Sequence, residues 1–302
     1  MRILITGSTG LLGQALSRHL APTGDVTGLS RHAPTIPSAA RHVVCDLTDA
    51  AQTRDVMTKL HPDVVIHTQA FSNVDECERD PRLAEAMNVT TTVNVVKAIQ
   101  GIGSLLVYVS TDYVFDGAKG RPYDETDSPK PLSVYGRSKL EGERLVLDYA
   151  YGVVVRPSTL FGHGRTNFCD QIVLRVNAGQ PVQVFVDQVT SPTYTEDLAE
   201  GLDDLVQAIR ERSTIAALPS RVYHITNAGC CSRLEFAQRV VDLVGGSREY
   251  LQPIRMAQQQ RPAPRPACSA LTTRYLSQII GRTLRPWDAA LEAYLRQRRW
   301  LN

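Results

Sequence analysis

Short runs of β-branched and other apolar residues alternate with longer stretches of helical periodicity from the N-terminus to about residue 157. This alternation is typical of βαβ units around a parallel sheet, whose right-handed crossovers place helices on both faces. We therefore expect an α/β protein with a doubly wound parallel sheet. The expected strands are residues 2–6, 26–29, 42–45, 64–68, 105–110 and 153–156, and the expected helices are residues 11–20, 50–60, 81–100 and 134–149.

The pattern becomes less regular after Arg156, where glycine and proline predict loops at residues 161–165 and 261–266. We therefore divide the chain into a first domain of residues 1–157 and a smaller C-terminal lobe of residues 158–302. Two further apolar runs, residues 182–186 and 222–226, flank a helix that begins near Thr195. Parts of 182–228 are thus expected to return to the first domain.

Composition excludes several classes of partner. The 302 residues carry 33 basic and 31 acidic side chains, and a net charge of +2 is too small to hold nucleic acid by its field alone. Every apolar run ends before the ~20 residues that a membrane-spanning helix needs. The first strand runs directly into a glycine motif without the apolar core of a signal peptide, so we expect a cytoplasmic protein. The six cysteines lack C-x-x-C spacing and are expected to be free thiols.

A glycine motif lies between the first strand and the first helix, at residues 7–13. Glycine permits a tight turn and the close approach of a pyrophosphate, whose charge then meets the helix N-terminus. The spacing is G-x-x-G-x-x-G, and a tight turn without a ligand is the alternative. We predict a Rossmann-type dinucleotide-binding domain over residues 1–157, with contacts from Gly7, Thr9, Gly10, Leu11, Leu12 and Gly13.

The end of the second strand bears on the choice of cofactor. An acidic residue at this place usually binds a free ribose 2′-hydroxyl, whereas arginine accommodates a 2′-phosphate. Here Ser30 and Arg31 follow the strand without a carboxylate, so NADP (as NADPH) is favoured and NAD stays an alternative. Arg31 as a solvated loop charge is the other interpretation. Asp46, followed by Leu47, either accepts from the adenine amino group or caps the next helix.

A tyrosine and a lysine four residues apart on a predicted helix, Tyr135 and Lys139, share one helix face. A ketone that takes a hydride needs a proton on its oxygen, which a tyrosine hydroxyl can donate. A nearby ammonium stabilises the tyrosine anion, and Lys139 is placed to do so and to hold the nicotinamide ribose. Thr111, at the carboxyl end of a strand, can donate a hydrogen bond to the same oxygen. We expect Thr111, Tyr135 and Lys139 to be catalytic.

At these residues the chain resembles the extended short-chain dehydrogenase/reductase superfamily, and within it the dTDP-4-dehydrorhamnose reductases. The resemblance runs along nearly the whole chain, and its most specific part is Ser-Thr-Asp-Tyr-Val-Phe-Asp-Gly at residues 110–117. Other matching segments are residues 3–7, 62–67, 135–139, 191–194 and 265–266. The resemblance implies NADPH-dependent reduction of a nucleotide-linked 4-keto-6-deoxy sugar, in a Rossmann domain joined to a C-terminal substrate lobe.

The resemblance also implies roles for individual residues. Asp112 and Tyr113 would help to form the sugar site, and Ala70 and Phe71 would lie along the cofactor. Asn88 would belong to the structural core of the active site, with a helix-surface amide as the alternative. Related sugar-nucleotide dehydratases continue Thr-Asp with glutamate, so Tyr113 argues against dehydration.

Several positions depart from the family pattern. Thr159 stands where these reductases carry a tryptophan against the sugar, so it leaves the sugar open. Arg265 either meets a substrate diphosphate or is solvated. Gln69 replaces a small residue beside the cofactor. Gln14 follows the glycine motif where some relatives place a metal-binding glutamate, so no metal is expected.

Two other functions stay open. One is an epimerase or a different nucleotide-sugar reductase of the superfamily, which the change at Thr159 favours. The other is a non-catalytic regulatory subunit similar to the β subunit of methionine adenosyltransferase. The expected partner is a small nucleotide sugar, and a homodimer is an open alternative to a monomer. His224 is expected to pack in the core.

Overall fold

The computed structural model describes residues 1–22, 24–34, 41–212 and 215–301. Its centre is a seven-stranded sheet with the order β11-β6-β5-β4-β1-β2-β3, in which every pairing is parallel. The β-branched runs of β5 and β6 are buried throughout, as expected for strands that helices cover on both faces. The strands are β1 (Arg2–Thr6), β2 (Asp25–Ser30), β3 (Arg41–Val44), β4 (Val64–His67), β5 (Leu105–Val109), β6 (Gly152–Arg156) and β11 (Val222–His224).

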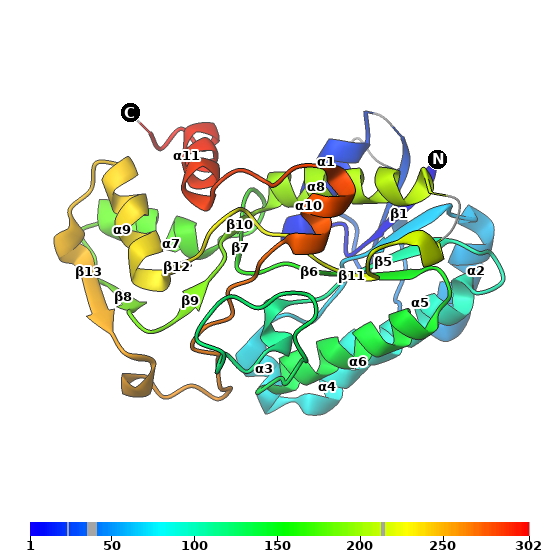
Figure 1. Ribbon diagram of the computed structural model, residues 1–302, viewed down its shortest axis with the longest axis horizontal. Helices are drawn as coiled ribbons and strands as arrows, with labels where there is room; N and C mark the ends of the chain where they lie inside the picture. The colour runs from blue at the N-terminus through cyan, green and yellow to red at the C-terminus, as the bar shows by residue number, and fades with distance from the viewer. Residues whose placement is uncertain (23, 35–40, 213–214, 302) are drawn as a thin grey trace.

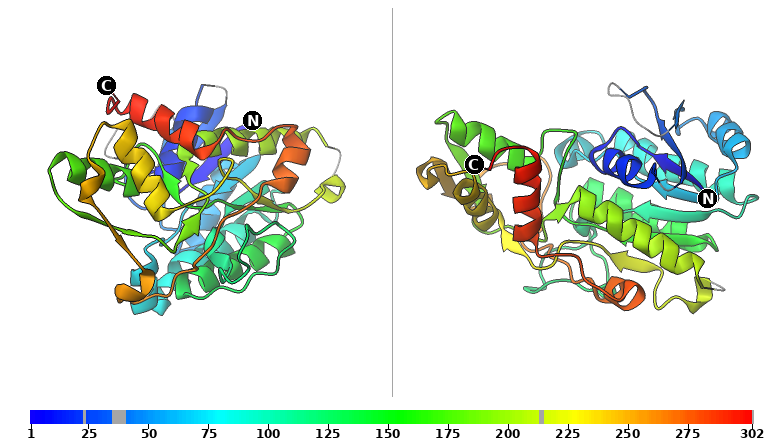
Figure 2. Two further views of the ribbon diagram at one scale, coloured as in Figure 1. Left: turned by 60° about the vertical axis from the view of Figure 1, so that its left-hand side comes forward. Right: turned by 90° about the horizontal axis from the view of Figure 1, so that it is seen from above.

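Helices cover both faces of this sheet (Figures 1 and 2). On one face, α1 (Leu11–Leu20), α8 (Thr195–Arg210) and α10 (Arg274–Ile280) share an apolar core with β1. On the other, α2 (Ala50–Leu60), α5 (Thr91–Ile99) and α6 (Val134–Asp148) share a second core with the sheet. The Rossmann-type, doubly wound fold predicted from the hydrophobic pattern is therefore confirmed.

The helix expected over residues 81–100 runs without a break from residue 81 to residue 99, but it is not α-helical throughout. It consists of α4 (Pro81–Glu85), a π-helical turn (Ala86–Thr90) and α5. A further short helix, α3 (Val74–Arg79), precedes it and was not predicted. Single π turns within α-helices are frequent at functional sites. This turn carries the buried Asn88.

The remaining elements form a smaller group with its own apolar core, which lies apart from the large sheet in Figure 1. Its helices are α7 (Phe168–Asn177), α9 (Arg233–Leu243) and α11 (Trp287–Gln297). Its strands pair as β8 (Val182–Phe185) with β13 (Leu251–Ile254), and β9 (Val189–Thr190) with β12 (Cys231–Ser232). The pair β7 (Leu160–Phe161) and β10 (Thr193–Tyr194) connects the two parts, and 3-10 turns lie at Asp112–Val114, Ile215–Ala217, Arg248–Tyr250 and Met256–Gln258.

The two apolar runs at residues 182–186 and 222–226 pair in different sheets. The second forms β11 at the edge of the large sheet and, with α8, returns to the first part of the chain. The first forms β8, which pairs with β13 away from that sheet. Nothing local distinguishes the two runs, because the pairing depends on a strand about seventy residues downstream. The division at residue 157 stays a prediction.

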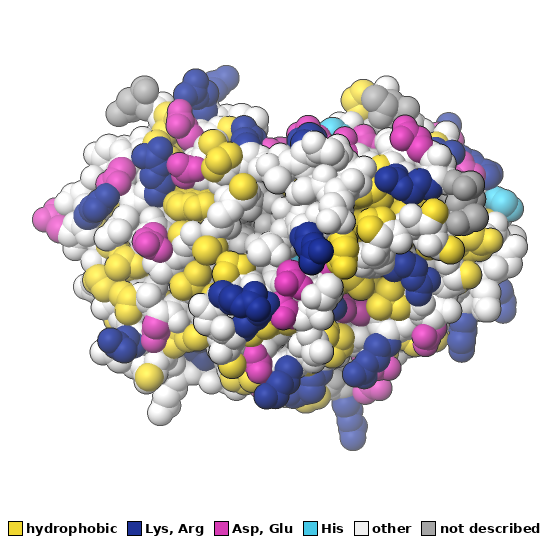
Figure 3. All heavy atoms as spheres, in the orientation of Figure 1, with side chains coloured by type: hydrophobic (Ala, Val, Ile, Leu, Met, Phe, Trp, Pro, Cys, Tyr) yellow, Lys and Arg dark blue, Asp and Glu magenta, His cyan; other side chains and the backbone are white. Residues whose placement is uncertain are grey.

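The described part of the chain has a mixed surface, free cysteines and no membrane-spanning helix. On the face shown in Figure 3, basic and acidic side chains are interspersed among apolar and neutral ones. All six cysteines, which lie in the described ranges, are free. In the described part of the chain, no helix combines the length and apolarity needed to cross a membrane.

Candidate active site

The glycine motif forms the tight turn between β1 and α1. Gly7 has a φ of +67°, and a Cβ on Gly13 would lie 2.3 Å from the carbonyl oxygen of Gly7. Only glycine therefore allows this turn to pack so closely against the first turn of α1. No side chain caps α1, so its first backbone N–H groups are available to a phosphate.

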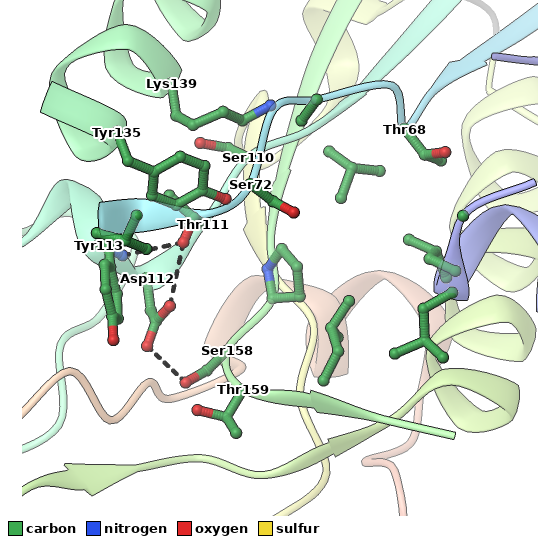
Figure 4. Close-up of a pocket in the computed structure, with 18 of the residues that line it drawn as sticks. Thr68, Ser72, Ser110, Thr111, Asp112, Tyr113, Tyr135, Lys139, Ser158 and Thr159 are labelled. Carbon is green, nitrogen blue, oxygen red and sulfur yellow. Dashed lines mark hydrogen bonds between the residues drawn. The ribbon is translucent and has the colours of Figure 1, made fainter. Parts of the chain in front are cut away.

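Two cavities meet beside this turn. The first, here called the Tyr135 cavity, has a volume of about 380 Å³ (Figure 4), and the second, here called the Arg31 cavity, has a volume of about 210 Å³. Of the predicted residues, Gly10, Leu11, Leu12, Gly13, Ala70, Thr111, Asp112, Tyr113, Tyr135, Lys139 and Thr159 line the Tyr135 cavity. The Arg31 cavity is lined by Gly7, Thr9, Gly10, Ser30, Arg31, Asp46, Leu47 and Ala70. The residues predicted to hold the cofactor and those predicted to react thus share one continuous region.

In the Arg31 cavity, the side chain of Arg31 is exposed and its Nε lies 3.3 Å from Nε2 of the neighbouring His32. Among the residues that the structure describes it forms no ion pair with a carboxylate, so it can meet a phosphate. The Ser30 hydroxyl donates to the carbonyl oxygen of His32 at 2.7 Å, so the predicted donation to a phosphate needs a rotation of this side chain. Sequence alone could not show this local competition.

Asp46 is not the cap of α2. Asp49 takes that place and accepts from the backbone N–H groups of Ala51 and Gln52. Asp46 instead accepts from the backbone N–H and the hydroxyl of Thr48, and these bonds lower the pKa of its carboxyl group. The capping interpretation of Asp46 is therefore wrong, and the residue lines the Arg31 cavity.

Tyr135 and Lys139 extend from one face of α6 toward the Tyr135 cavity, with Thr111 beside them after β5 (Figure 4). Burial raises the pKa of Tyr135, and the neighbouring Thr111 hydroxyl opposes this rise. Burial also lowers the pKa of Lys139 to about 7, while the nearby Glu143 carboxylate acts in the opposite direction. The tyrosine therefore keeps its proton at neutral pH, and the lysine is the more easily deprotonated of the two.

A buried ion pair lies one helical turn beyond Lys139. Glu143 accepts two bonds from Arg156, at 2.9 and 2.6 Å, and a third from the Ser110 hydroxyl at 2.5 Å. The side chains of Glu143 and Arg156 are only 2% and 4% exposed. This network ties α6 to the ends of β5 and β6, so it fixes the helix that carries the tyrosine and the lysine.

Asp112 is buried, and both of its carboxylate oxygens are engaged. One accepts from Thr111 Oγ1 at 3.2 Å, and the other accepts from Ser158 Oγ at 2.7 Å and Ser269 Oγ at 2.5 Å. Burial raises the pKa of Asp112, and the three hydroxyl groups oppose this rise. The carboxylate thus orients the Thr111 side chain and joins three separate segments of the chain.

Asn88 lies in the π turn and is 1% exposed. Its amide exchanges bonds with the backbone of Phe71, accepting from the N–H at 2.7 Å and donating to the carbonyl at 3.2 Å. It also donates to Ser138 Oγ at 2.9 Å. The surface-amide alternative is therefore wrong, whereas a role of Asn88 in the core of the active site stays a prediction.

Two predicted residues lie outside both cavities. Phe71 packs its ring in the apolar cluster that contains Tyr135, and only its backbone is held by Asn88. Arg265 forms a bidentate ion pair with Asp75, with N–O distances of 2.7 and 2.9 Å. Its guanidinium is therefore already occupied by a carboxylate 190 residues away in the chain.

Two arginines that the sequence interpretation missed do line the Tyr135 cavity, Arg165 and Arg233. Arg233 begins α9. Burial raises the pKa of both Asp112 and Tyr113, and the charge of Arg233 opposes part of this rise. Arg165 belongs to the Gly-His-Gly-Arg segment that was interpreted only as a loop. The glycines around it were the one local signal that a backbone turn approaches another part of the site.

The other expectations concern Gln69, His224 and metal ions. Gln69 lines the Arg31 cavity and accepts from Thr91 Oγ1 at 3.0 Å. His224 is fully buried, which lowers its pKa to about 3 and agrees with its expected place in the core. Over the described ranges, no group of three or more His, Cys, Asp or Glu side chains is arranged to hold a metal ion.

Comparisons with known proteins cover almost the whole chain. Residues 1–299 match the family described as RmlD substrate binding domain. The chain is 36% identical over 302 residues to dTDP-4-dehydrorhamnose reductase of Mycobacterium tuberculosis (strain CDC 1551 / Oshkosh), covering 97% of this chain and 92% of that protein. It is 32% identical over 299 residues to the spore coat polysaccharide biosynthesis protein SpsK of Bacillus subtilis (strain 168), covering 98% of both.

A similar solved structure is that of dTDP-4-dehydrorhamnose reductase from Bacillus anthracis str. Ames in complex with NADP. It is 29% identical, with a TM-score of 0.87 over 98% of this chain and 99% of that chain. The sequence matches and the structural match thus both extend over the large sheet and over the smaller group of elements.

Proposed function

Because the chain belongs to the RmlD substrate binding domain family, we propose that it reduces a nucleotide-linked 4-keto-6-deoxy sugar with NADPH, as dTDP-4-dehydrorhamnose reductases do. The observation that carries this proposal is the placement of Thr111, Tyr135 and Lys139 in one cavity that continues to the glycine turn. The uncapped α1 and the close glycine packing fit a dinucleotide pyrophosphate.

The bound cofactor supplies a hydride to the carbonyl carbon. Tyr135 donates its proton to the carbonyl oxygen, so that the ketone becomes a hydroxyl group. Thr111 donates its single hydroxyl proton to Asp112 in this structure. In the reaction the hydroxyl turns this proton to the carbonyl oxygen, where it stabilises the developing negative charge. Since burial raises the pKa of Tyr135, the tyrosinate left behind needs a cation, and we assign this role to Lys139.

The exposed Arg31 supports NADPH over NADH. It follows β2 as a cation without an ion-pair partner in the described ranges, at a place where a ribose 2′-phosphate would add negative charge. The carboxylate of Asp46, a residue that also lines this cavity, remains our candidate for the adenine amino group.

At the other end of the Tyr135 cavity, we assign Asp112, Tyr113 and Thr159 to the sugar site. Tyr113 accepts from Gln188 Nε2 at 3.3 Å and packs edge-on against Tyr135 with a centroid distance of 6.2 Å. Thr159 is small, so the cavity admits a sugar without a stacking ring at this place. This observation favours, as a second candidate, reduction or epimerisation of a different nucleotide sugar.

A panel of nucleotide-linked 4-keto sugars tests the proposal. Purified protein is expected to oxidise NADPH with a 4-keto-6-deoxy sugar and to yield a 6-deoxy sugar without loss of water. Tyr135→Phe is expected to lose nearly all of this rate while it still binds NADPH. An unchanged rate in Tyr135→Phe would contradict the mechanism. Absence of turnover on every sugar, together with recovery of a synthetase partner, would instead favour the regulatory subunit.

We also propose a cytoplasmic location and a small-molecule substrate as the main partner. The six free cysteines agree with a reducing compartment. The homodimer stays a prediction, which light scattering of the purified chain tests directly.

A further inference from the structure

One arginine lies where the two cavities meet. Gly10, Thr68, Ala70 and Arg165 line both the Tyr135 cavity and the Arg31 cavity, and Arg165 is the only charged residue among them. It comes from the connection between β7 and α7, far along the chain from the glycine motif. A dinucleotide that fills both cavities passes this point with its pyrophosphate.

The loop that carries Arg165 rests on the glycine turn. Gly162 and Gly164 have φ values of +155° and +131°, a backbone that side chains rarely adopt. A Cβ on Gly164 would lie 3.0 Å from Oε1 of Gln14. Gln14 in turn donates from Nε2 to the carbonyl oxygen of Thr9 at 2.9 Å. Gly164 therefore lets the loop approach Gln14 beside the glycine turn, whereas Gly162 lets it approach Thr195 at the start of α8.

The guanidinium of Arg165 is exposed and uncommitted. Within the described part of the chain it makes no ion pair and no hydrogen bond, whereas Arg265 is held by Asp75. An arginine fork can form two parallel hydrogen bonds to phosphate oxygens. Arg165 thus combines the right chemistry with the right place.

We propose that Arg165 binds the pyrophosphate of the dinucleotide, together with the N-terminus of α1. This inference rests on the proposed function in one respect, that the ligand is a nicotinamide dinucleotide. A diphosphate of the substrate has the same chemistry, but the substrate end of the Tyr135 cavity has its own arginine, Arg233, beside Asp112 and Tyr113. The Arg31 cavity includes Arg165 and not Arg233.

Equilibrium binding to the full chain, without substrate, tests this assignment. Arg165→Ala is expected to weaken NADPH, NADH and ADP-ribose alike, by about 10- to 100-fold, because all three carry the pyrophosphate. Adenosine 2′-monophosphate, which lacks it, is expected to bind as before. Arg165→Lys keeps the charge without the planar guanidinium. Its affinity for NADPH is expected to lie between that of the wild type and that of Arg165→Ala.

Two matched arginine variants give the contrast. Arg31→Ala is expected to weaken NADPH and adenosine 2′-monophosphate but to leave NADH unchanged. Arg54→Ala, on the exposed side of α2, is expected to change none of these affinities. Thermal unfolding of each unliganded variant shows that it folds like the wild type.

The outcomes separate the inference from the function. If the wild type binds NADPH, and Arg165→Ala binds both NADPH and ADP-ribose as tightly as the wild type does, the inference is wrong and the proposed function stands. Binding of dTDP is measured in the same way. If Arg165→Ala weakens dTDP and leaves NADPH, NADH and ADP-ribose unchanged, the arginine belongs to the substrate site and the inference is again wrong. If the wild type binds neither NADPH nor NADH, both are overturned.

Discussion

Nζ of Lys139 lies 4.0 Å from the centre of the Tyr108 ring, within a site that leaves the lysine 1% exposed. An ammonium over an aromatic face is attracted by the ring quadrupole. This attraction does not replace the lost hydration, because burial still lowers the pKa of Lys139 to about 7. The lysine is thus a buried cation that releases its proton more easily than an exposed lysine does.

This relationship predicts how stability depends on pH. In the unfolded chain Lys139 keeps its proton up to about pH 10.5, whereas in the folded chain it releases the proton near pH 7. Between these pH values the unfolded state binds more protons than the folded state. The contribution of Lys139 to the free energy of unfolding therefore rises as the pH rises. The free energy of unfolding of the wild type minus that of Lys139→Met should therefore increase from pH 7 to pH 10 in denaturant titrations. A flat or falling difference would show that folded Lys139 keeps its proton.

The buried Glu143–Arg156 pair predicts a large loss of stability. Glu143→Gln should lower the free energy of unfolding by about 3–5 kcal/mol, because Arg156 stays buried without its counter-ion. Glu141→Gln is the matched control on the same helix, since Glu141 pairs with Arg144 at the surface and its loss should change stability by less than ~1 kcal/mol. Equal effects in urea unfolding would contradict the distinction.

The Thr111 hydroxyl is expected to act on the rate rather than on cofactor affinity. Thr111→Val should lower kcat by about 10²- to 10³-fold, because the developing oxyanion loses a hydrogen-bond donor. Thr111→Ser keeps the hydroxyl and should retain most of the rate. Steady-state kinetics with NADPH binding measured in parallel check this, and a loss confined to KM would assign the threonine to binding alone.

The close packing at Gly13 predicts a strict requirement for glycine. Gly13→Ala places a Cβ against the Gly7 carbonyl and should both weaken NADPH binding and cost about 1–3 kcal/mol of stability. Gly101→Ala is the control, because a Cβ there meets nothing within 4 Å. Binding titrations that find Gly13→Ala equal to the wild type would show that the turn relaxes without cost.

Hydrophobic periodicity predicted the sheet well because β-branched runs such as β5 and β6 are buried on both faces whatever their neighbours are. The turn at residues 7–13 was equally local, since its conformation requires glycine itself. Tyr135 and Lys139 could be paired because helical spacing alone places them on one face.

The remaining features depend on partners far along the chain. The π turn interrupts a regular helical pattern at Asn88, whose partners are Phe71 and Ser138. Arg265 is a good phosphate ligand in isolation, but Asp75 occupies it across 190 residues. Such choices follow from which groups meet after folding, and residue type carries no information about them.

The Asp112 carboxylate gathers hydroxyl groups separated from it by 46 and 157 residues. Such distant pairings form late, because a long stretch of chain must be ordered before the contact contributes. During synthesis, a nascent chain that has not yet produced Ser269 cannot complete this set. The hydrogen bonds around Thr111 are therefore complete only after Ser269 has been synthesised and has folded against Asp112.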